Sequence, residues 1–462
     1  MKPSGFLLLL LALAPGSVVA EGQTWHVAGS GNDSWEGTTL PRAFRTLQRA
    51  AGVVEPGDTV MIGDGEYATP AETPASSVVV IDRSGRPDAW ITWRARDGAN
   101  PVIRPTGWNG ILVTGSYHRF EGLTIEGAND SITLAEALAD AKNAKPNGRF
   151  NTNGIFINGR LRPPEQKPHH VLIRNCTVAK CPGGGIVAIE SDYLTVEDCR
   201  VFENGWFMRY GGSGITTLHN WRFDDAPGYH VVIQRNRVWN NKTLVPWEKV
   251  GRLSDGNGIL LDVTEEDAEG ASNPNADTAI AASPSSGEGP AVPKTAPSQK
   301  LPRPAWKGRA LVANNVCAFN GGSGIHTFRT RHVDIVNNTT YWNGQIVGYP
   351  ELFANRSDDV VILNNIIVPR PAGKVTSNNR NGVIRWDYNL YPVSQTVFDA
   401  PNDLVADPGF VSEDLDRRVP RFRTRPDGPA TDSGSAELPQ RTDITGAARP
   451  RGRSPDRGAY EQ

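Results

Sequence analysis

The sequence lacks the features that mark several large classes of protein. It has four cysteines in 462 residues, too few for a disulfide scaffold. Its formal net charge is −2, so nucleic acid is not indicated as a partner. Beyond the first twenty residues, no apolar run is long enough to span a bilayer, and we expect no transmembrane anchor. Something other than crosslinks must therefore stabilise the chain.

The one long apolar run lies at the N-terminus. Lys2 precedes an apolar core from Phe6 to Ala14, and small residues end the stretch at Ala20. This pattern is typical of a secretory signal peptide over residues 1–20, and its core is too short to be a stable anchor. We predict a secreted protein, extracellular or periplasmic, and expect it to be a monomer.

Glycine (48) and proline (35) are abundant, which predicts many turns and few long helices. Arginine outnumbers lysine, 37 to 11. That bias is consistent either with codon usage or with recognition of planar carboxylates, which arginine binds in a bidentate manner.

A repeat runs through the middle of the chain. Each copy has an aliphatic anchor, a Cys or Asn three residues later, and in most copies another Cys or Asn five residues further on. The anchors are Ile173, Val196, Ile233, Val312, Ile335 and Ile362. The first polar column is Cys176, Cys199, Asn236, Asn315, Asn338 and Asn365. The second is Cys181, Asn204, Asn241, Asn320 and Asn343, and Arg370 breaks it.

Small polar residues at a fixed phase predict ladders of side chains at the turns of stacked coils. Alternating apolar positions between the ladders indicate strands. Where no insertion intervenes, the anchors lie 23 residues apart (Ile173 to Val196, Val312 to Ile335) or 27 apart (Ile335 to Ile362), too short for strand–helix–strand units. We therefore predict a solenoid of short parallel strands stacked at roughly 4.8 Å. The cysteines are expected to be buried ladder residues, with a Cys176–Cys199 bridge left open, and Cys317 falls on an inward apolar column.

Each coil has a second strand that begins with Gly-Ile, for example at Gly214, Gly258 and Gly324. Insertions occur only before and after this strand. The longest, residues 263–305, is rich in Ala, Ser, Pro and Glu and is predicted to be mobile. Insertions on one face of a repeat protein commonly mark the binding face, so the Gly-Ile strands are expected to form the floor of a groove.

At this point the chain resembles the pectate-lyase-like right-handed parallel β-helix proteins, in particular bacterial secreted members with an N-terminal cap. The cap pattern comprises Trp25, Val27, Gly37-Thr38, Pro41, Thr46-Leu47, Pro56-Gly57-Asp58, Val60, Gly65 and Tyr67. The resemblance implies an all-β fold, a right-handed parallel β-helix with an N-terminal helical cap and an irregular C-terminal cap. It also implies a polysaccharide partner, because the family consists mostly of polysaccharide lyases and glycoside hydrolases, with some binding proteins.

The predicted organisation follows the repeat. It comprises a signal peptide (1–20), a cap with the first strands (21–75), the β-helix (76–400) with its insertion (263–305), and a C-terminal cap (401–462). Within the cap an amphipathic helix is expected over the FRTLQRAAGVV stretch, residues 44–54, shielding the end of the core. The C-terminal segment is expected to cover the other end.

Polar residues gather on one face of four consecutive Gly-Ile strands, where the second residue after the glycine should face the groove and the fourth and fifth lie at the strand exit. The catalytic candidates are Glu190, His219, Asp262, His326 and Arg329, with Lys249 and Arg252 from an insertion. The candidates for sugar binding are Trp206, Trp221 and Trp247, because sugar C–H faces pack on indole rings. Each has a structural alternative: acids at coil edges, histidines that cap turns, tryptophans that pack loops. Their convergence on one face favours a site.

Two reactions fit these residues, and a third possibility is a non-catalytic glycan-binding surface protein. In β-elimination of a uronate polymer, Lys249 or His219 would be the base, and Arg252 or Arg329 would neutralise the developing enolate. One lyase branch of the resembling fold carries its lysine base where Asp262 stands here, a departure that weakens this mechanism. In hydrolysis, Asp262 with Glu190 or Asp255 would supply paired carboxylates. We rank lyase ahead of hydrolase.

The acidic residues raise the question of whether the protein binds calcium as a cofactor. An EF-hand loop starting at Asp255 would need glycine where Leu260 stands, and the nonapeptide calcium repeat fails at Thr216. A calcium site outside these motifs, through Asp255, Asp262 or Glu190, stays open because an acidic sugar could bring further ligands.

Overall fold

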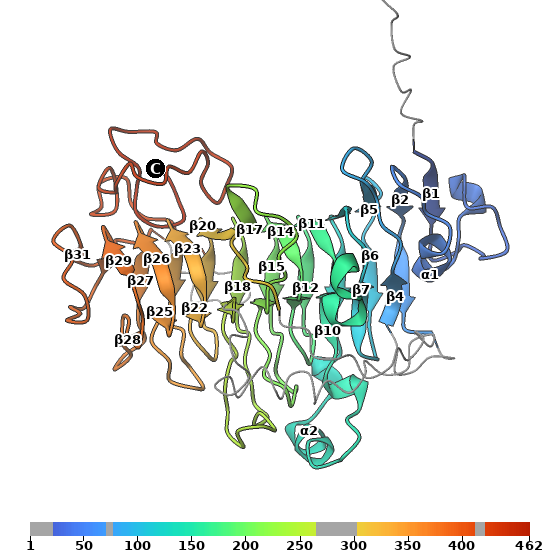
Figure 1. The fold of residues 1–462 in the computed structure, drawn as a ribbon, viewed down its shortest axis with the longest axis horizontal. Helices are drawn as coiled ribbons and strands as arrows, with labels where there is room; N and C mark the ends of the chain where they lie inside the picture. Colours follow the sequence, from blue (N-terminus) through green and yellow to red (C-terminus); the bar gives the residue numbers. More distant parts are fainter. Residues whose placement is uncertain (1–21, 71–76, 265–302, 412–420) are drawn as a thin grey trace, which may run out of the picture.

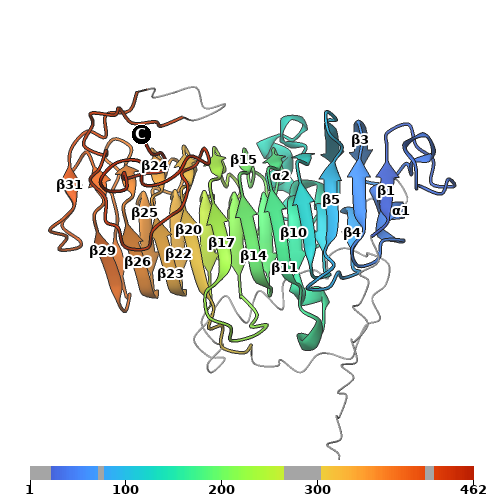
Figure 2. The ribbon, with the colours of Figure 1, turned by 90° about the horizontal axis from the view of Figure 1, so that it is seen from above.

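The computed structural model describes residues 22–70, 77–264, 303–411 and 421–462. In these residues the chain winds into three parallel sheets, which we call A, B and C, around one long axis (Figures 1 and 2). Each coil adds a strand to sheet C, then A, then B. This right-handed parallel β-helix confirms the predicted fold. The predicted signal peptide and most of the insertion 263–305 lie outside the described residues.

Sheet A carries the anchors. Ile173 pairs with Val196, Val196 with Ile233, and the series continues in register to Ile362. The strands, in spatial order, are β1 (Thr24–Val27), β2 (Thr59–Ile62), β5 (Ile91–Ala95), β8 (His118–Glu121), β11 (His169–Arg174), β14 (Asp192–Glu197), β17 (Tyr229–Gln234), β20 (Arg309–Ala313), β23 (Arg331–Val336), β26 (Asp358–Leu363) and β29 (Ile384–Asp387).

Sheet B follows each sheet A strand after a tight turn. Cys317 lies on its inward column, paired with Val238 and Thr340, and is fully buried as predicted. The strands are β3 (Gly65–Ala68), β6 (Pro101–Arg104), β9 (Thr124–Glu126), β12 (Thr177–Ala179), β15 (Arg200–Phe202), β18 (Arg237–Trp239), β21 (Val316–Ala318), β24 (Thr339–Tyr341), β27 (Ile366–Val368), β30 (Leu390–Tyr391) and β31 (Leu404–Val405).

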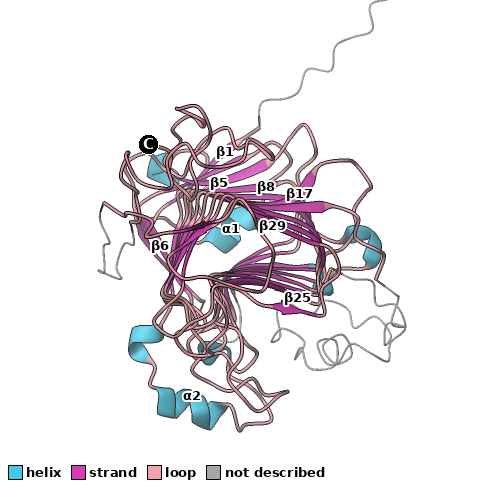
Figure 3. Cartoon of the chain, turned by 90° about the vertical axis from the view of Figure 1, so that its left-hand side faces the viewer, coloured by secondary structure: helices cyan, strands magenta, loops and turns pink. Residues whose placement is uncertain are grey.

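Sheet C contains the Gly-Ile strands, whose isoleucines pair in register from Ile111 to Ile325 and point into the core. Its strands are β4 (Ser77–Ile81), β7 (Asn109–Val113), β10 (Asn153–Asn158), β13 (Ile186–Ile189), β16 (Ile215–Leu218), β19 (Ile259–Asp262), β22 (Ile325–Phe328), β25 (Leu352–Asn355) and β28 (Asn378–Asn379). Figure 3, along the axis, shows the three sheets enclosing the core.

Both predicted ladders are present. In the first, the Asn236 side-chain amide donates to the Asn315 Oδ1 at 3.0 Å, and the pattern continues through Asn338. Cys176 and Cys199 belong to this ladder as free thiols, with the Cys176 amide donating to the Cys199 sulfur at 3.4 Å, so no bridge joins them. Each rung places buried donors opposite acceptors, which removes the cost of leaving them unpaired.

The second ladder ends on an acid rather than an amide. Asn320 donates to Asn343 at 2.7 Å, and Asn343 donates its backbone and side-chain N–H groups to the two carboxyl oxygens of Glu351. Glu351 is almost completely buried, and burial raises its pKa to about 8. The ladder therefore ends on a carboxyl that keeps its proton at neutral pH.

The N-terminal helix is shorter than predicted. Helix α1 spans only Leu47–Ala51, because Phe44 donates to the His26 carbonyl in β1 and accepts from the Ala28 amide just after it, and so cannot join the helix. The Thr46 side chain caps its start by accepting from the Arg49 amide, and Gly52 ends it. Leu47, Ala50 and Ala51 are buried in the core, so α1 still shields the end of the solenoid (Figure 1).

The other helices lie in the loops between strands. They are α2 (Leu134–Asp140) and the short 3-10 helices η1 (Leu40–Arg42), η2 (Asn129–Ser131), η3 (Gly148–Phe150), η4 (Gly159–Leu161) and η5 (Pro164–Gln166). None of the helices in the described ranges is long and apolar enough to cross a membrane. The C-terminal segment differs from our expectation, since Phe422 and Tyr460 join Tyr341 in an apolar cluster along the outer side of sheet B. The apolar outer face of these last coils explains why the segment packs along the side.

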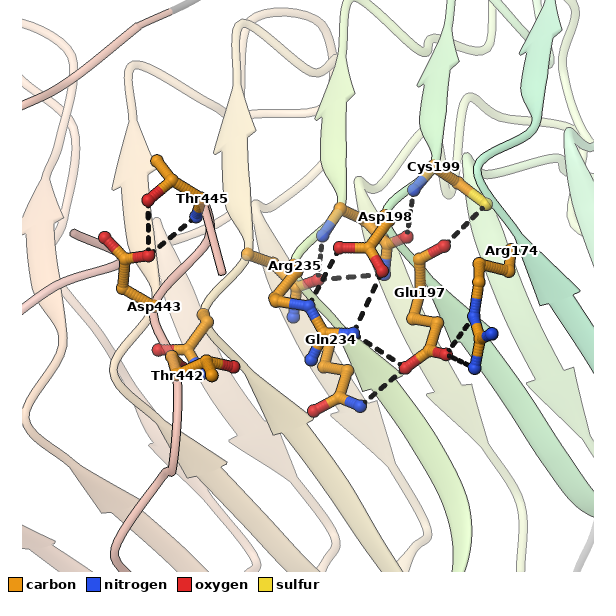
Figure 4. Close-up of polar contacts among 12 residues, drawn as sticks. Arg174, Glu197, Asp198, Cys199, Gln234, Arg235, Thr442, Asp443 and Thr445 are labelled. Atoms are coloured by element: carbon orange, nitrogen blue, oxygen red, sulfur yellow. Dashed lines mark hydrogen bonds and ion pairs between the residues drawn. The ribbon is translucent and has the colours of Figure 1, made fainter. Parts of the chain in front are cut away.

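The outer face of sheet A carries a network of charged side chains (Figure 4). Glu197 on β14 accepts hydrogen bonds from Arg174, Gln234 and Arg235 at 2.6 to 2.8 Å, so one carboxylate links three adjacent strands. Arg235 also pairs with Asp198. This network accounts for the polar character of a face that carries none of the predicted site residues.

Candidate active site

The candidate site lies on the outer face of sheet C between β13 and β22. Leu260 and His326 lie next to each other on this face, in register on β19 and β22. The loops that precede the strands contribute Lys249, Arg252 and Asp255, and the strand exits contribute Glu190, His219, Asp262 and Arg329. Both ends of the same strands therefore supply polar groups, as the insertion pattern predicts.

Three predicted residues occupy one column at the strand exits. Glu190, His219 and Arg329 each follow the end of a sheet C strand in a left-handed conformation, with φ of 50°, 56° and 50°. Backbone hydrogen bonds between coils hold this turn; for example, the His219 amide donates to the Asp262 carbonyl at 3.1 Å. Asp262 is the last residue of β19, immediately before the same column. Stacking thus brings the four residues together.

The charge of Glu190 is already balanced by two cationic side chains of the protein. Lys167 Nζ lies 2.6 Å from Glu190 Oε2, and Arg160 Nε lies 3.7 Å from Oε1. All three side chains are largely shielded from solvent. Glu190 is therefore better placed to orient Arg160 and Lys167 than to react with a sugar.

The contact with Arg160 fixes the tautomer of His219. Arg160 Nη2 lies 3.5 Å from His219 Nδ1, and a guanidinium can only donate, so Nδ1 accepts. Burial, together with Arg303, Arg160, Arg329 and Lys249, lowers the pKa of His219 well below its usual value. The imidazole is therefore neutral with its proton on Nε2, an atom that has no hydrogen-bond partner. This arrangement favours His219 as a hydrogen-bond donor rather than a base.

Asp262 and Asp255 are half-buried acids, and Asp255 acts electrostatically on Asp262. Burial, reinforced by Asp255, raises the pKa of Asp262 to about 8, and the guanidiniums of Arg329, Arg303 and Arg160 oppose this only in part. Burial raises the pKa of Asp255 to about 6, with a hydrogen bond from Ser254 opposing it. At neutral pH, Asp262 is thus mainly protonated and Asp255 mainly ionised. The Asp262 Oδ1 atom has no hydrogen-bond partner.

Asp255 depends on a close glycine. A Cβ at Gly211, whose φ is 74°, would lie 2.4 Å from the Asp255 Oδ2, so no other residue leaves room for this carboxyl. Asp255 itself has a φ of 65°, in the turn that leads into β19. The approach of Gly211 fixes where the carboxyl lies.

His326 lies further along the face in an aromatic setting. Its ring centroid is 4.0 Å from that of Phe353 and 5.9 Å from that of Tyr349. Burial lowers the pKa of His326 to about 3, and neither ring nitrogen has a hydrogen-bond partner. Tyr349 Oη lies 3.5 Å from Ser254 Oγ, which connects this group to the turn that carries Asp255. His326 thus carries two buried ring nitrogens without a partner among the described residues.

Lys249 and Arg252 lie on the same insertion but differ in surroundings. Burial, with the charge of Arg160, lowers the pKa of Lys249. Lys249 also acts electrostatically on His219, whereas the exposed Arg252 acts on Tyr349. The structure therefore brings Lys249 and Arg329 to the His219–Asp262 group and places Arg252 to one side.

The three predicted tryptophans are half-buried, and each has a lysine ammonium over its ring. The pairs are Lys242 over Trp206 at 5.1 Å, Lys167 over Trp221 at 4.6 Å, and Lys249 over Trp247 at 5.9 Å. Trp206 also donates its indole N–H to the Asn240 carbonyl and packs beside Phe207, which fastens its loop. Trp221 and Trp247 contact Lys167 and Lys249, the two lysines that lie at the candidate site.

The described residues do not by themselves fit a calcium ion. Calcium takes six to eight oxygen ligands. Nowhere in the described ranges do three or more His, Cys, Asp and Glu side chains gather as a metal site would require. Near Asp255 the other acid is Asp262, which is mainly protonated and is surrounded by guanidiniums. A calcium ion would bind here only if oxygens of an acidic sugar completed its coordination.

Sequence reasoning missed Arg160, Lys167, Arg303 and Tyr349. Arg160 and Lys167 lie in the loop after β10, and Arg303 donates to the Val263 carbonyl at 2.9 Å from the far end of the long insertion. Arg160 carries a usable signal, because it comes two residues after the exit of a Gly-Ile strand. The other three reach the site only through the path of their loops.

The sequence comparisons agree with this architecture. Residues 25–358 match the family model described as the Pel9A-like, right handed beta helix region, which covers more than half of the chain. The chain therefore belongs to the Pel9A-like right-handed β-helix family. No curated protein matches the sequence.

Solved structures show the same fold at low sequence identity. The crystal structure of pectate lyase Pel9A aligns with a TM-score of 0.54 and 17% identity, over 95% of this chain and 96% of that chain. A rhamnogalacturonan lyase aligns with a TM-score of 0.43 and 16% identity, over 87% and 96%. The complex of XylC with xylose gives 0.42 and 11%, over 95% and 99%. At these identities the likeness establishes the fold alone.

Proposed function

We propose that this protein cleaves an acidic polysaccharide by β-elimination. The observation that carries the proposal is that Arg160, Arg303 and Arg329 all act on both the His219 imidazole and the Asp262 carboxyl. Three guanidinium groups therefore act on one place at the strand exits, and this grouping suits the carboxylate of a uronate, which arginine recognises well. Secretion to meet such a polymer is part of the proposal.

Each group then has a chemical role. Lys249, whose lowered pKa leaves more of it as the free amine, takes the proton alpha to the uronate carboxyl. Arg329 and Arg303 neutralise the charge that develops on that carboxyl. The protonated Asp262 gives its proton to the departing glycosidic oxygen, and the His219 Nε2–H binds a sugar oxygen. The products are an unsaturated sugar end and a new reducing end, with no water consumed.

Hydrolysis is the second candidate because of one observation. Asp255 acts on Asp262, and their pKa values are about 6 and about 8, so between these two pH values Asp255 is mainly ionised and Asp262 mainly protonated. Paired groups whose pKa values are pushed apart commonly serve as base and acid. In that case Asp262 would be the acid and Asp255 the base or nucleophile.

The test is incubation of the purified protein with a panel of uronate polymers. β-Elimination gives unsaturated ends that absorb in the ultraviolet, whereas hydrolysis gives only new reducing ends. Lys249→Ala is expected to lower the rate by at least about 100-fold, the scale of a lost general base. Lys374→Ala, which removes an exposed lysine in another coil, is the matched control and is expected to leave it unchanged. Retention of a polymer that is never cut would indicate a glycan-binding protein instead.

A further inference from the structure

A buried histidine lies at the start of β17 and takes no part in the reaction proposed above. His230 is 2% exposed, and its ring is stacked on that of Tyr193 at a centroid distance of 4.0 Å. The backbone of Gly308 also packs on this ring, since a Cβ there would lie 2.6 Å from the His230 Cγ. His230 is therefore fixed between two coils.

Both ring nitrogens of His230 face hydrogen-bond acceptors. Nδ1 lies 3.1 Å from each carboxyl oxygen of Asp192. Nε2 lies 2.9 Å from the Ala226 carbonyl and 3.0 Å from the Tyr193 Oη, which donates its own proton to Asp224 at 2.5 Å. A neutral imidazole has a proton on only one nitrogen. The contacts of both nitrogens are therefore made together only by an imidazolium.

Asp192 is the carboxylate that faces this charge, and it is also 2% exposed. Besides His230, it accepts hydrogen bonds at 2.8 to 3.0 Å from the Tyr193 amide, the Phe223 amide and the Trp306 indole N–H. These contacts all need acceptor oxygens, which a carboxylate supplies and a protonated acid would lose in part. The pair of Asp192 and His230 thus joins β14 to two other stretches, the loop of residues 219–228 and the segment of residues 303–308.

Each of these two stretches also carries a group of the candidate site. The first begins with His219, and its Trp221 ring lies 4.6 Å from the Lys167 ammonium. The second begins with Arg303, which acts electrostatically on both His219 and Asp262. The contacts of His230 and Asp192 therefore hold in place the parts of the chain that bring these groups together.

The other titratable groups near His230 do not supply a second positive charge. Burial lowers the pKa of His169 to about 4 and also lowers that of His170, which stacks on Tyr193 at 4.2 Å. The cations further out are paired with acids: Arg222 and Lys307 with Asp225, and Arg309 of β20 with Asp334 and Asp359.

The same contacts decide when His230 is charged. Burial alone would lower its pKa, but the hydrogen bonds to Asp192 and the Ala226 carbonyl, with the charges of Asp192 and Asp224, outweigh burial and raise the pKa. The proton is therefore present at low pH and is lost as pH rises through this raised value.

We infer that His230 is a positioning residue for the candidate site, and that its imidazolium holds the two stretches that place His219 and Arg303. The neutral ring gives up its contact with Asp192 or with the Ala226 carbonyl, and both stretches become less firmly held. This inference rests on the proposed function for its effect on catalysis, and on the contacts of His230 for its effect on the two stretches.

The experiment measures hydrogen–deuterium exchange of the wild type and of His230→Gln between pH 6 and pH 9, corrected for the intrinsic effect of pH on exchange. At pH 6 the amides of residues 219–228 and 303–308 are expected to exchange at least about tenfold faster in the variant, the scale of one hydrogen bond to a charged group. The difference should close as pH rises, because the wild type then loses the same proton. A difference that does not change with pH would show a purely structural role and overturn the inference.

His332→Gln is the matched control. This histidine lies near the start of β23, two strands from β17 in sheet A, and its Nδ1 lies 2.7 Å from an Asp359 oxygen. The variant should leave exchange in both stretches unchanged. Should His230→Gln fail to fold, the wild type alone decides: both stretches should lose protection together as pH rises while β23 keeps it, and constant protection would refute the inference.

Catalysis gives a separate readout on a uronate polymer that the protein cuts. The wild-type kcat/KM should exceed that of His230→Gln by at least about tenfold at pH 6, and the ratio should fall towards one at pH 9. A ratio that stays constant with pH would contradict the inference. If no polymer is cut, the proposed function fails, and the exchange experiment still decides the role of His230.

Discussion

Glu351 offers a quantitative test of how the solenoid is held together. It ends the second ladder by accepting both N–H groups of Asn343 in a fully buried place. Because burial raises its pKa from 4.5 to about 8, the folded protein holds this proton over a range in which the unfolded chain has lost it. The free energy of unfolding therefore falls as pH rises from 4.5 towards 8.

The size of the effect follows from the two pKa values. Each pH unit in this window costs about 1.4 kcal/mol, so the loss between pH 5 and pH 7 is about 2 to 3 kcal/mol. Glu351→Gln removes the ionisable group and keeps an acceptor. In the first ladder a single amide oxygen accepts both N–H groups, as Asn365 does from Asn338, so glutamine is expected to replace the carboxyl.

Urea unfolding of both proteins at pH 5 and pH 7, followed by tryptophan fluorescence, measures this difference. All other groups titrate alike in the two proteins, so the change in the gap between them isolates Glu351. From pH 5 to pH 7, we expect the free energy of unfolding of the variant to rise by about 2 to 3 kcal/mol relative to that of the wild type. A constant gap would show that Glu351 is ionised in the folded protein and would refute the reasoning.

Three further predictions concern the ladder and the site. Asn315→Ala breaks the first ladder at a fully buried rung, where several polar groups lose their partners. Urea unfolding should therefore show that the free energy of unfolding falls by at least about 3 kcal/mol. A variant as stable as the wild type would contradict the ladder as a source of stability. The initial rate of cleavage should fall as pH rises through about 8, where Asp262 loses its proton. The Asp262→Asn variant should cleave at least about tenfold more slowly than the wild type. Full activity of the variant would show that Asp262 takes no part in the reaction. EDTA should leave the rate unchanged, and a loss restored by added calcium would show that the polymer completes a calcium site.

The fold was predictable because its determinants are periodic in the sequence. The anchors from Ile173 to Ile362, the Gly-Ile strands and the asparagine ladders repeat at a fixed phase, and each is found in register. The helix near Leu47 was predicted too long because its apolar periodicity continues through Phe44, which tertiary contacts hold in the cap. Local pattern could not reveal that competition.

The candidate site was predictable only where it shares the repeat. Glu190, His219, Asp262 and Arg329 were found together because they hold equivalent or adjacent positions at strand exits. The tautomer of His219 depends on Arg160, which arrives from an aperiodic loop. Sequence spacing cannot give the path of such a loop, and the balance of charge that decides each role depends on it.

The most direct test of β-elimination is the mass of the products. A uronate oligosaccharide that the protein cuts once should give two fragments whose masses add up to the mass of the substrate, because elimination consumes no water. Fragments whose masses add up to the substrate plus one water molecule would contradict β-elimination and establish hydrolysis.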